Sequence, residues 1–236
     1  MRILRALVIA NEKKPIAQQV KKQAQEFLVS RGIRISSSSP QLIITVGGDG
    51  TVLFSKRYYG IPFFSIGSQT SFICQANFSD WRKKLSKALR SPRLERRLLL
   101  EATLNSRKLP LSLNEIGIRN PEPRILSMHL QAGSRHFAFR ADGVFFSTPT
   151  GSPAYCYSCG GKEMEKGEQR YQIVAIAPFR RIFKPTIIQA SAACTLRISA
   201  PDKAHLFVDG QPAGIFSKGQ TLRVSAAKKK FWFVKI

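Results

Sequence analysis

The apolar run Leu42–Val46, followed at once by GGDGT at residues 47–51, is the feature that most limits how this chain can fold. Five consecutive apolar or β-branched residues are typical of a parallel strand that is buried on both faces. Glycines directly after such a strand let the backbone adopt conformations that other residues avoid and approach a ligand closely. A buried strand, a glycine-rich turn and a following helix together predict an open α/β arrangement.

The first 95 residues continue this pattern of alternating strands and helices. Residues 15–32 have helical periodicity, with Pro15 suited to a helix start and Gly32 to a helix end. Further strands are predicted at residues 3–10, 33–35 and 61–66, and further helices at residues 51–59 and 81–89.

After Arg97 the pattern changes to short apolar runs separated by turn residues, which is typical of an all-β domain. The predicted strands cover residues 98–104, 116–119, 125–131, 136–140, 144–147, 173–177, 186–189, 194–198, 205–208, 221–224 and 231–234. A helix is expected after Pro153. With the boundary near Ser91-Pro92, the sequence predicts an α/β domain over residues 1–95 and a β-rich domain over residues 96–236.

The charge balance is unusual, with 38 Lys and Arg against 14 Asp and Glu and a net charge of +24. Such a surplus attracts polyanions, including nucleotides, polyphosphate, nucleic acid and anionic membrane surfaces. No nucleic-acid-binding module is recognisable, so nucleic acid is not the expected partner. No run approaches the roughly 18–20 apolar residues of a membrane span. We therefore expect a cytoplasmic protein that does not act at a membrane.

Asp49 stands inside the glycine-rich turn and is a candidate general base or metal partner. Backbone N–H groups of such a turn suit an anion, which a carboxylate repels unless it accepts a proton or binds Mg²⁺. The alternative is a tight strand–helix turn in which Asp49 caps the helix. The GxxxxGK[ST] and GxGxxG motifs of common nucleotide-binding folds are both absent.

Three further segments carry polar groups suited to a nucleotide. Asn114-Glu115 pairs an amide with a carboxylate that can hold hydroxyl groups, although an exposed loop pair is the simpler interpretation. Residues 142–155 run into a hydroxyl-rich turn where Ser152 is expected to cap a helix, which on its own is equally explained as a capped helix. Asp209-Gly210-Gln211 alone favours a hairpin turn.

Cysteines and histidines give no comparable signal. Cys156 and Cys159 have CxxC spacing, but no second pair completes a zinc site, and we expect both thiols to pack as small apolar groups. The three histidines have no obvious catalytic partner in sequence and are expected to be structural or exposed. No residue is assigned as a metal ligand.

Taken together and in order, these segments resemble the NAD kinase family, which phosphorylates the adenosine 2′-hydroxyl of NAD to give NADP. The resemblance covers roughly residues 40–215 and also includes Gly160-Gly161. It implies a Rossmann-like α/β domain followed by an all-β, sandwich-like domain. It also implies Mg²⁺ or another divalent cation as cofactor, ATP or inorganic polyphosphate as phosphoryl donor, and a homodimer or homotetramer.

The resemblance assigns roles position by position. Asp49 matches the catalytic aspartate, which deprotonates or orients the 2′-hydroxyl. The other matched positions are expected to bind substrate: Gly47, Gly48, Gly50 and Thr51 in the turn, Asn114 and Glu115 at a ribose, Tyr155 at the adenine, Asp142 and Ala154 near the nicotinamide end, and Thr150 and Ser158 among the neighbouring hydroxyls.

Two departures from the family pattern keep alternatives open. Residues 65–73 are shorter than the usual segment and lack its asparagine, and Pro153 replaces a threonine. A non-catalytic or altered-specificity NAD(P)-binding homologue would also explain these changes. A lipid or sugar kinase would share GGDGT, but would not need the two later motifs together.

Overall fold

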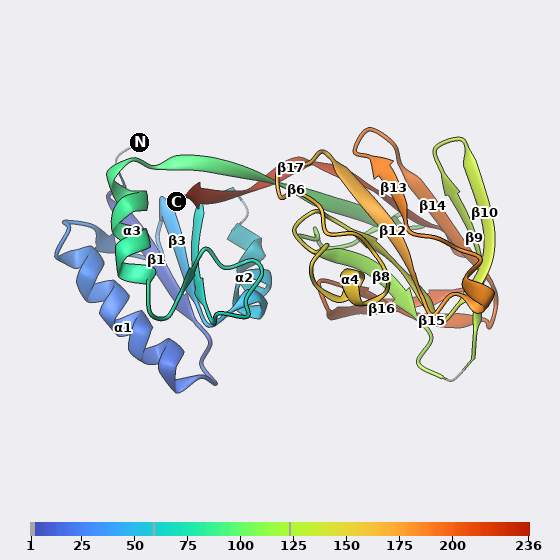
Figure 1. Ribbon diagram of the computed structural model, residues 1–236, viewed down its shortest axis with the longest axis horizontal. Helices are drawn as coiled ribbons and strands as arrows, with labels where there is room; N and C mark the ends of the chain where they lie inside the picture. The colour runs from blue at the N-terminus through green and yellow to red at the C-terminus, as the bar shows by residue number, and fades with distance from the viewer. Residues whose placement is uncertain (1–2, 59, 123) are drawn as a thin grey trace. The chain divides into compact units, whose positions relative to one another are not determined.

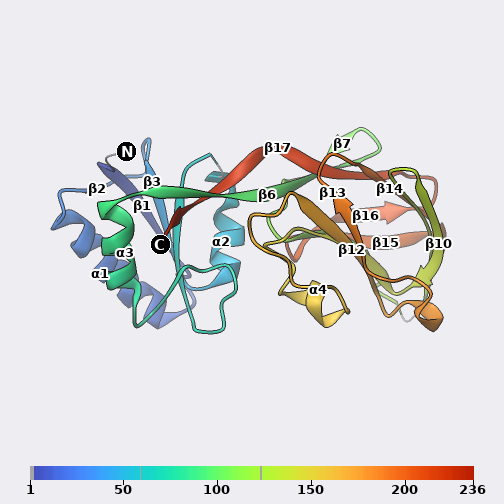
Figure 2. The same ribbon diagram turned by 45° about the horizontal axis from the view of Figure 1, so that its top comes forward.

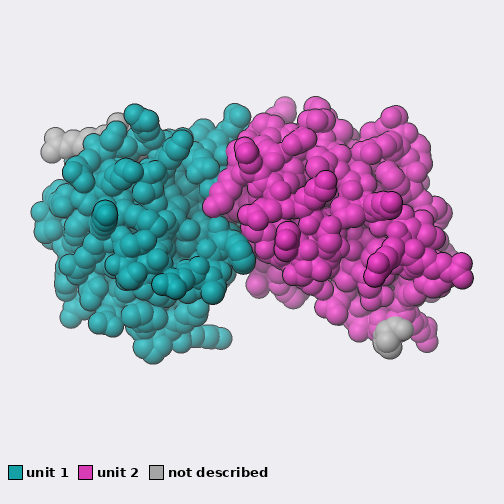
Figure 3. All heavy atoms as spheres, in the orientation of Figure 1, with its two compact units in different colours: residues 1–97, 230–236 teal, residues 98–229 magenta. Residues whose placement is uncertain are grey.

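The computed structural model describes residues 3–58, 60–122 and 124–236, which form two compact units (Figure 3). The first unit contains residues up to 97 together with 230–236, and the second contains residues 98–229. The strands β6 (Arg93–Leu104) and β17 (Leu222–Lys235) belong to both units, so the chain passes from one to the other twice. The sequence-based division at 95/96 did not include the return of residues 230–236.

Aromatic residues account for that return. Phe231 and Phe233 are fully buried in the first unit, and Phe233 pairs in register with Phe63 of β4 (Phe63–Gly67). The ring centroids of Phe63 and Phe231 lie 4.5 Å apart. Burying each such ring stabilises the fold by about 1.5–3 kcal/mol, which favours docking the end of the chain here.

The first unit is an open parallel sheet in the order β4-β3-β1-β2, with the end of β17 beside β4 (Figure 1). The further strands are β1 (Arg5–Ala10), β2 (Arg34–Ile35), β3 (Leu42–Val46) and the short β5 (Ala76–Asn77) next to β4. Every residue of β3 is buried, as the apolar run predicts. Because the strands are parallel, the turns that follow β1, β3 and β4 gather at one edge of the sheet.

Helices cover both faces of this sheet. In Figure 1, α1 (Pro15–Val29) and α3 (Trp81–Arg90) lie on one side and α2 (Asp49–Ser55) on the other. The α1 helix buries Ala17, Val20, Ala24 and Leu28, whereas Ile16 is exposed. Among the described residues, no helix is long and apolar enough to cross a lipid bilayer.

The second unit is a sandwich of two β-sheets (Figure 2). One sheet has the order β13-β12-β11-β8-β15-β16, and the other contains β10, β9, β14 and the first part of β17. The strands of the two sheets are β8 (Glu115–Arg119), β9 (Leu126–Ala132), β10 (Arg135–Ala141), β11 (Gly143–Ser147), β12 (Arg170–Ile176), β13 (Thr186–Gln189), β14 (Cys194–Ala200), β15 (Lys203–Val208) and β16 (Gln211–Ser217). The short strand β7 (Arg107–Lys108) pairs with the end of β6. Apolar side chains of both sheets form one core.

Four local features differ from the predictions. The two strands predicted at residues 221–224 and 231–234 are one strand, β17, because AAKKK at residues 226–230 continues the extended backbone. The strand β16 was not predicted, since Pro212 and Gly214 interrupt its pattern. The helix after Pro153 is a single turn, α4 (Tyr155–Ser158), and the residue before it is Ala154 rather than a capping Ser152. The helix predicted over residues 51–59 begins at Asp49 and continues as a 3-10 turn over Lys56–Tyr58; residue 59 lies outside the described residues.

Candidate functional site

The glycine-rich turn joins β3 to α2 in the first unit. Gly47 and Gly48 have φ values of 143° and 121°, in the left-handed region that favours glycine. A Cβ atom on Gly47 would lie 2.6 Å from Cβ of Asn11 and 2.7 Å from Oγ1 of Thr51. Any larger residue would therefore push this turn away from the loop that follows β1.

The carboxylate of Asp49 faces the loop that follows β4. Its Oδ2 atom accepts a hydrogen bond from the N–H of Phe72 at 2.8 Å, and its Oδ1 atom accepts from the N–H groups of Ile73 at 2.9 Å and Cys74 at 3.3 Å. No side-chain hydrogen bond caps α2, so the alternative in which Asp49 caps its own helix is wrong. The backbone donors fix the orientation of the carboxylate.

Two neighbours of this turn were not singled out from the sequence. Lys14 donates from Nζ to the carbonyl oxygen of Gly47 at 3.0 Å, which brings a positive charge to the turn. Cys74 has its thiol pKa raised to about 12, chiefly by burial and secondly by the charge of Asp49. Lys14 could have been found, because it lies just after β1 and the carboxyl ends of parallel strands meet at the same edge.

In the second unit, Asn114 and Glu115 stand at the beginning of β8, and both are buried. The backbone N–H groups of these two residues donate to the carboxylate of Asp209. The Oδ1 atom of Asn114 is buried and has no hydrogen-bond partner among the described residues. The exposed-loop interpretation of this pair is therefore wrong, and an acceptor atom is left unused beside Glu115.

The hydroxyl-rich turn after β11 packs directly on that pair. Thr148 donates from its N–H to the carbonyl oxygen of Asn114 at 2.8 Å and from Oγ1 to the carbonyl oxygen of Leu113 at 2.5 Å. A Cβ atom on Gly151 would lie 2.4 Å from the carbonyl oxygen of Asn114. Thr150 is buried nearby, and its Oγ1 atom also has no partner in the described chain. The motif residues 114 and 148–151 are thus one packed assembly.

A cavity of about 870 Å³ opens beside this assembly, within the size range of ligand sites in proteins. It is lined by Glu115, Arg119, Asn120, Pro121, Tyr155, His205, Leu206, Phe207, Gly210, Pro212, Gly214 and Ile215. The ring of Tyr155 is 45% exposed and packs against Phe145 with centroids 4.9 Å apart. Phe145 in turn contacts Phe207 edge-on at 5.5 Å. An aromatic wall that includes Tyr155 and Phe207 therefore lines the same hollow as the carboxylate of Glu115.

Alternation along β8 explains why Glu115 and Arg119 share this cavity. Residues 115, 117 and 119 point to the same face of a strand. Gly117 lies between the two charged residues, and a Cβ atom there would lie 2.4 Å from the ring of Phe207. His205 pairs in register with Arg119 and adds a second basic group at that end. Period-two spacing could have identified Arg119 from the sequence, but His205 depends on strand pairing.

Asp142, Ala154 and Ser158 are not among the residues that line this hollow, although the carbonyl oxygen of Asp142 accepts a hydrogen bond from the N–H of the lining residue Asn120 at 2.9 Å. Asp142 is exposed and precedes β11, whereas the hydroxyl-rich turn follows β11, so the two flank opposite ends of a five-residue strand. That strand spans about 17 Å. Ser158 is exposed at the end of α4, and Ala154 precedes it. Their roles stay predictions.

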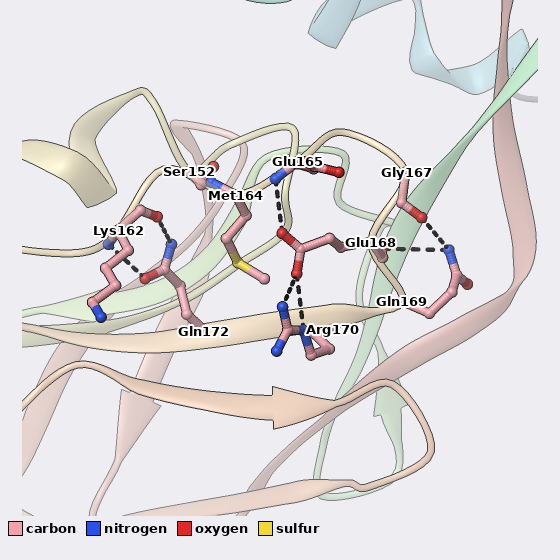
Figure 4. A network of polar contacts seen from close by, with 9 residues as sticks. All are labelled: Ser152, Lys162, Met164, Glu165, Gly167, Glu168, Gln169, Arg170 and Gln172. Atoms are coloured by element: carbon pink, nitrogen blue, oxygen red, sulfur yellow. Dashed lines mark hydrogen bonds and ion pairs between the residues drawn. The ribbon is translucent and has the colours of Figure 1, made fainter.

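A hydrogen-bond network holds the segment after α4 to the sheet (Figure 4). Ser152 does not cap a helix; its Oγ accepts from the N–H of Met164 at 2.8 Å and donates to the carbonyl oxygen of Pro149 at 2.9 Å. Gln172 of β12 bonds both the N–H and the carbonyl oxygen of Lys162, at 3.0 and 2.6 Å. Glu168 forms an ion pair with Arg170. These contacts fix the chain on both sides of α4, the helical turn that begins with Tyr155.

Cys156 lies in α4 and Cys159 directly follows it. Burial raises the pKa of the Cys156 thiol to about 12, so the neutral form dominates near neutral pH. The pKa of Cys159 is also raised by burial. Within residues 3–58, 60–122 and 124–236, no three His, Cys, Asp or Glu side chains gather at one point.

Comparison with known proteins gives a consistent result. Residues 113–236 match the model of the ATP-NAD kinase C-terminal domain. An NAD kinase from Methanosarcina barkeri is 31% identical over 209 residues, which cover 86% of this chain and 76% of that protein. An NAD kinase from Treponema denticola is 28% identical over 96% of this chain and 89% of its own length.

Solved structures share the fold. The crystal structure of yeast NADH kinase complexed with NADH has a TM-score of 0.88 at 18% identity, covering 100% of this chain and 84% of that one. An NAD kinase from Archaeoglobus fulgidus in complex with ATP has a TM-score of 0.82 at 22% identity, covering 98% of this chain and 93% of that one. The predicted α/β domain followed by a β-sandwich is confirmed, and the chain belongs to the NAD kinase family.

Proposed function

We propose that this protein is an NAD kinase that transfers a phosphoryl group to the adenosine 2′-hydroxyl of NAD, giving NADP. The observation that carries the proposal is the convergence of separate motifs in the second unit. Glu115 and Tyr155, which lie 40 residues apart in the sequence, line one cavity of about 870 Å³. The hydroxyl-rich turn just before Tyr155 is hydrogen-bonded to the backbone next to Glu115. The cavity combines aromatic faces with a few fixed polar groups, as nucleotide sites do.

The acceptor substrate is assigned to this cavity. Glu115 accepts hydrogen bonds from ribose hydroxyls, and the unused Oδ1 of Asn114 is a second acceptor beside it. The half-exposed ring of Tyr155 offers a face for a base. Arg119 supplies positive charge at the other end of β8, which suits the diphosphate of NAD, and the imidazole of His205 lines the same end of the cavity.

Asp49 is assigned to the reacting hydroxyl, as the family resemblance implies. A carboxylate held by three backbone N–H groups is already oriented to accept a hydrogen bond or a proton from an alcohol. Phosphoryl transfer proceeds through a loose transition state, so positioning and charge neutralisation contribute more than base strength. Lys14, bonded to the carbonyl oxygen of Gly47, supplies one positive charge for the donor phosphates.

The donor set fits Mg²⁺ that arrives with the donor better than a resident ion. No cluster of three metal-ligating side chains exists in the described ranges, and Mg²⁺ commonly uses one or two carboxylates, water and substrate phosphates. When bound, the ion would neutralise charge on the donor phosphates.

We propose ATP or inorganic polyphosphate as the phosphoryl donor, because the net charge of +24 attracts both polyanions. We also propose that the protein acts in the cytoplasm as a homodimer or homotetramer.

An acceptor panel tests the function. The full chain is incubated with Mg²⁺ and γ-labelled ATP together with NAD, NADH, diacylglycerol or a hexose, and the labelled product is separated. We expect label on NAD or NADH alone. Label on lipid or sugar would replace the proposal with a different kinase, and NAD binding without any labelled product would indicate a non-catalytic homologue.

A further inference from the structure

Asp209 lies in the turn between β15 and β16, where its sequence context indicates only a hairpin. It has a φ of 50°, in the left-handed region that aspartate and asparagine tolerate better than most residues. Its exposed fraction is only 3%. A buried carboxylate is costly unless hydrogen-bond donors surround it, so its partners show what the turn is built to hold.

Four consecutive residues of the Asn114-Glu115 segment, residues 112–115, donate hydrogen bonds to this carboxylate. Oδ1 of Asp209 accepts from Oγ of Ser112 at 2.6 Å and from the N–H groups of Asn114 at 2.8 Å and Glu115 at 3.1 Å. Oδ2 accepts from the N–H of Leu113 at 3.0 Å. In return, the N–H of Asp209 donates to the carbonyl oxygen of Glu115 at 2.9 Å.

The carbonyl groups of this segment are bound by a different motif. Thr148 bonds the carbonyl oxygens of Leu113 and Asn114. The backbone of Leu113, Asn114 and Glu115 therefore has its N–H groups on Asp209 and its carbonyl groups on Thr148 or Asp209. Because the N–H and carbonyl groups of this segment are hydrogen-bonded to Asp209 and Thr148, the backbone that carries the Asn114 side chain is fixed. The Oδ1 atom of Asn114 does not accept a hydrogen bond from a neighbouring backbone N–H group.

We propose that Asp209 is a positioning residue for the acceptor substrate. It acts through Asn114 and Glu115 by fixing their backbone, so that both side chains meet a ribose diol without reorganisation. This inference rests on the proposed function, because it assigns the pair to NAD. Preorganised groups bind more tightly because they lose less freedom on binding.

The substitution Asp209→Asn isolates this role. Asparagine has the same shape and tolerates the same backbone conformation, but its NH₂ group cannot accept the hydrogen bond that one oxygen now receives. The matched control is Asp202→Asn, which removes the same charge from an exposed position just before β15. Ser112→Ala is the milder test, since it deletes one donor and leaves the three N–H groups in place.

We expect Asp209→Asn to raise both the KM and the calorimetric Kd for NAD by about tenfold, with kcat and the KM for ATP changed by less than about threefold. Ser112→Ala should raise the KM for NAD by about threefold, and Asp202→Asn should change nothing. In a chain that already carries Glu115→Gln, adding Asp209→Asn should raise the KM and Kd for NAD much less than it does in the unmodified chain. The reason is that Asp209 acts on NAD through the side chain of Glu115. This non-additivity is not expected from a merely structural role.

Two results would overturn the inference. One is an unchanged KM and Kd for NAD in folded Asp209→Asn and in Ser112→Ala. The other is a uniform loss of activity toward both substrates that is additive with Glu115→Gln. Failure of the proposed function is distinguishable: if the unmodified chain forms no NADP but loses NAD affinity on Asp209→Asn, the function fails and the positioning role stands. If it neither binds NAD nor forms NADP, both fail.

Discussion

The carboxylate of Asp49 is hydrogen-bonded to the backbone of Ile73, with Oδ1 2.9 Å from the amide nitrogen. Two adjacent N–H groups, those of Phe72 and Cys74, complete the contact. The residue assigned to the reacting hydroxyl is therefore also the residue that fixes the loop after β4. Asp49→Asn removes the charge but keeps one acceptor oxygen, whereas Asp49→Ala removes both, so the two effects can be measured separately.

We predict that Asp49→Asn and Asp49→Ala both lower kcat by about 100-fold or more, the usual range for a general base. Asp49→Ala should also lower the free energy of unfolding by about 1–2 kcal/mol, because three backbone donors lose their acceptor. Asp49→Asn, which keeps one acceptor oxygen, should lose less. Initial rates and urea denaturation measure the two effects. The charge-matched control is Asp80→Asn, because Asp80 directly precedes α3 and forms a surface ion pair with Lys84. A kcat of Asp49→Asn within threefold of that of the unmodified chain would show that Asp49 does not take part in phosphoryl transfer.

The ring of Tyr155 should carry the contact with the base, and its hydroxyl should not. Stacking of a base on an aromatic ring is worth about 1–3 kcal/mol. We therefore expect Tyr155→Ala to raise the KM for NAD by about tenfold, while Tyr155→Phe stays close to the unmodified chain. Steady-state kinetics with NAD as the varied substrate distinguish them. If the phenylalanine variant is as impaired as the alanine variant, a hydrogen bond from the hydroxyl is the interaction that matters.

Gly117 should be intolerant of a side chain because of the aromatic wall. Its added Cβ would lie 2.4 Å from the ring of Phe207 and 2.7 Å from that of Phe145. Overpacking of this kind costs about 1–3 kcal/mol, so Gly117→Ala should lower the urea midpoint and weaken NAD binding by displacing Phe207. Gly167→Ala is the control, since nothing lies within 4 Å of its Cβ position. Equal stability of the two variants would contradict the packing that we describe.

Stability should fall in alkaline solution partly because of Cys156. Burial raises its pKa to about 12 in the folded state, against an ordinary value of 9.0. Between these values the folded state keeps a proton that the unfolded state has lost, so the free energy of unfolding decreases as pH rises. One such group contributes at most about 1.4 kcal/mol per pH unit. Unfolding of the unmodified chain and of Cys156→Ala between about pH 8 and 10.5 measures this contribution. The variant should show the shallower slope, and equal slopes would contradict a buried neutral thiol.

The sequence was sufficient to predict an element where its local residue pattern agrees with its tertiary environment. The run Leu42–Val46 is a wholly buried strand, and the turn after it has the backbone that its glycines predict. The Asn114-Glu115 pair looked like an exposed loop because its burial comes from Asp209 and Thr148, which lie far along the chain. For the same reason Asp209 looked like a simple hairpin residue. His205 reaches the cavity only through its pairing with Arg119, which no sequence spacing encodes.

Formation of NADP tests the central claim most directly. The purified chain is incubated with NAD, Mg²⁺ and either ATP or polyphosphate, and the product is detected with an NADP-specific dehydrogenase. We predict NADP formation that depends on donor and enzyme and is nearly abolished by Asp49→Asn. Folded protein that binds NAD but forms no NADP with either donor would contradict the account.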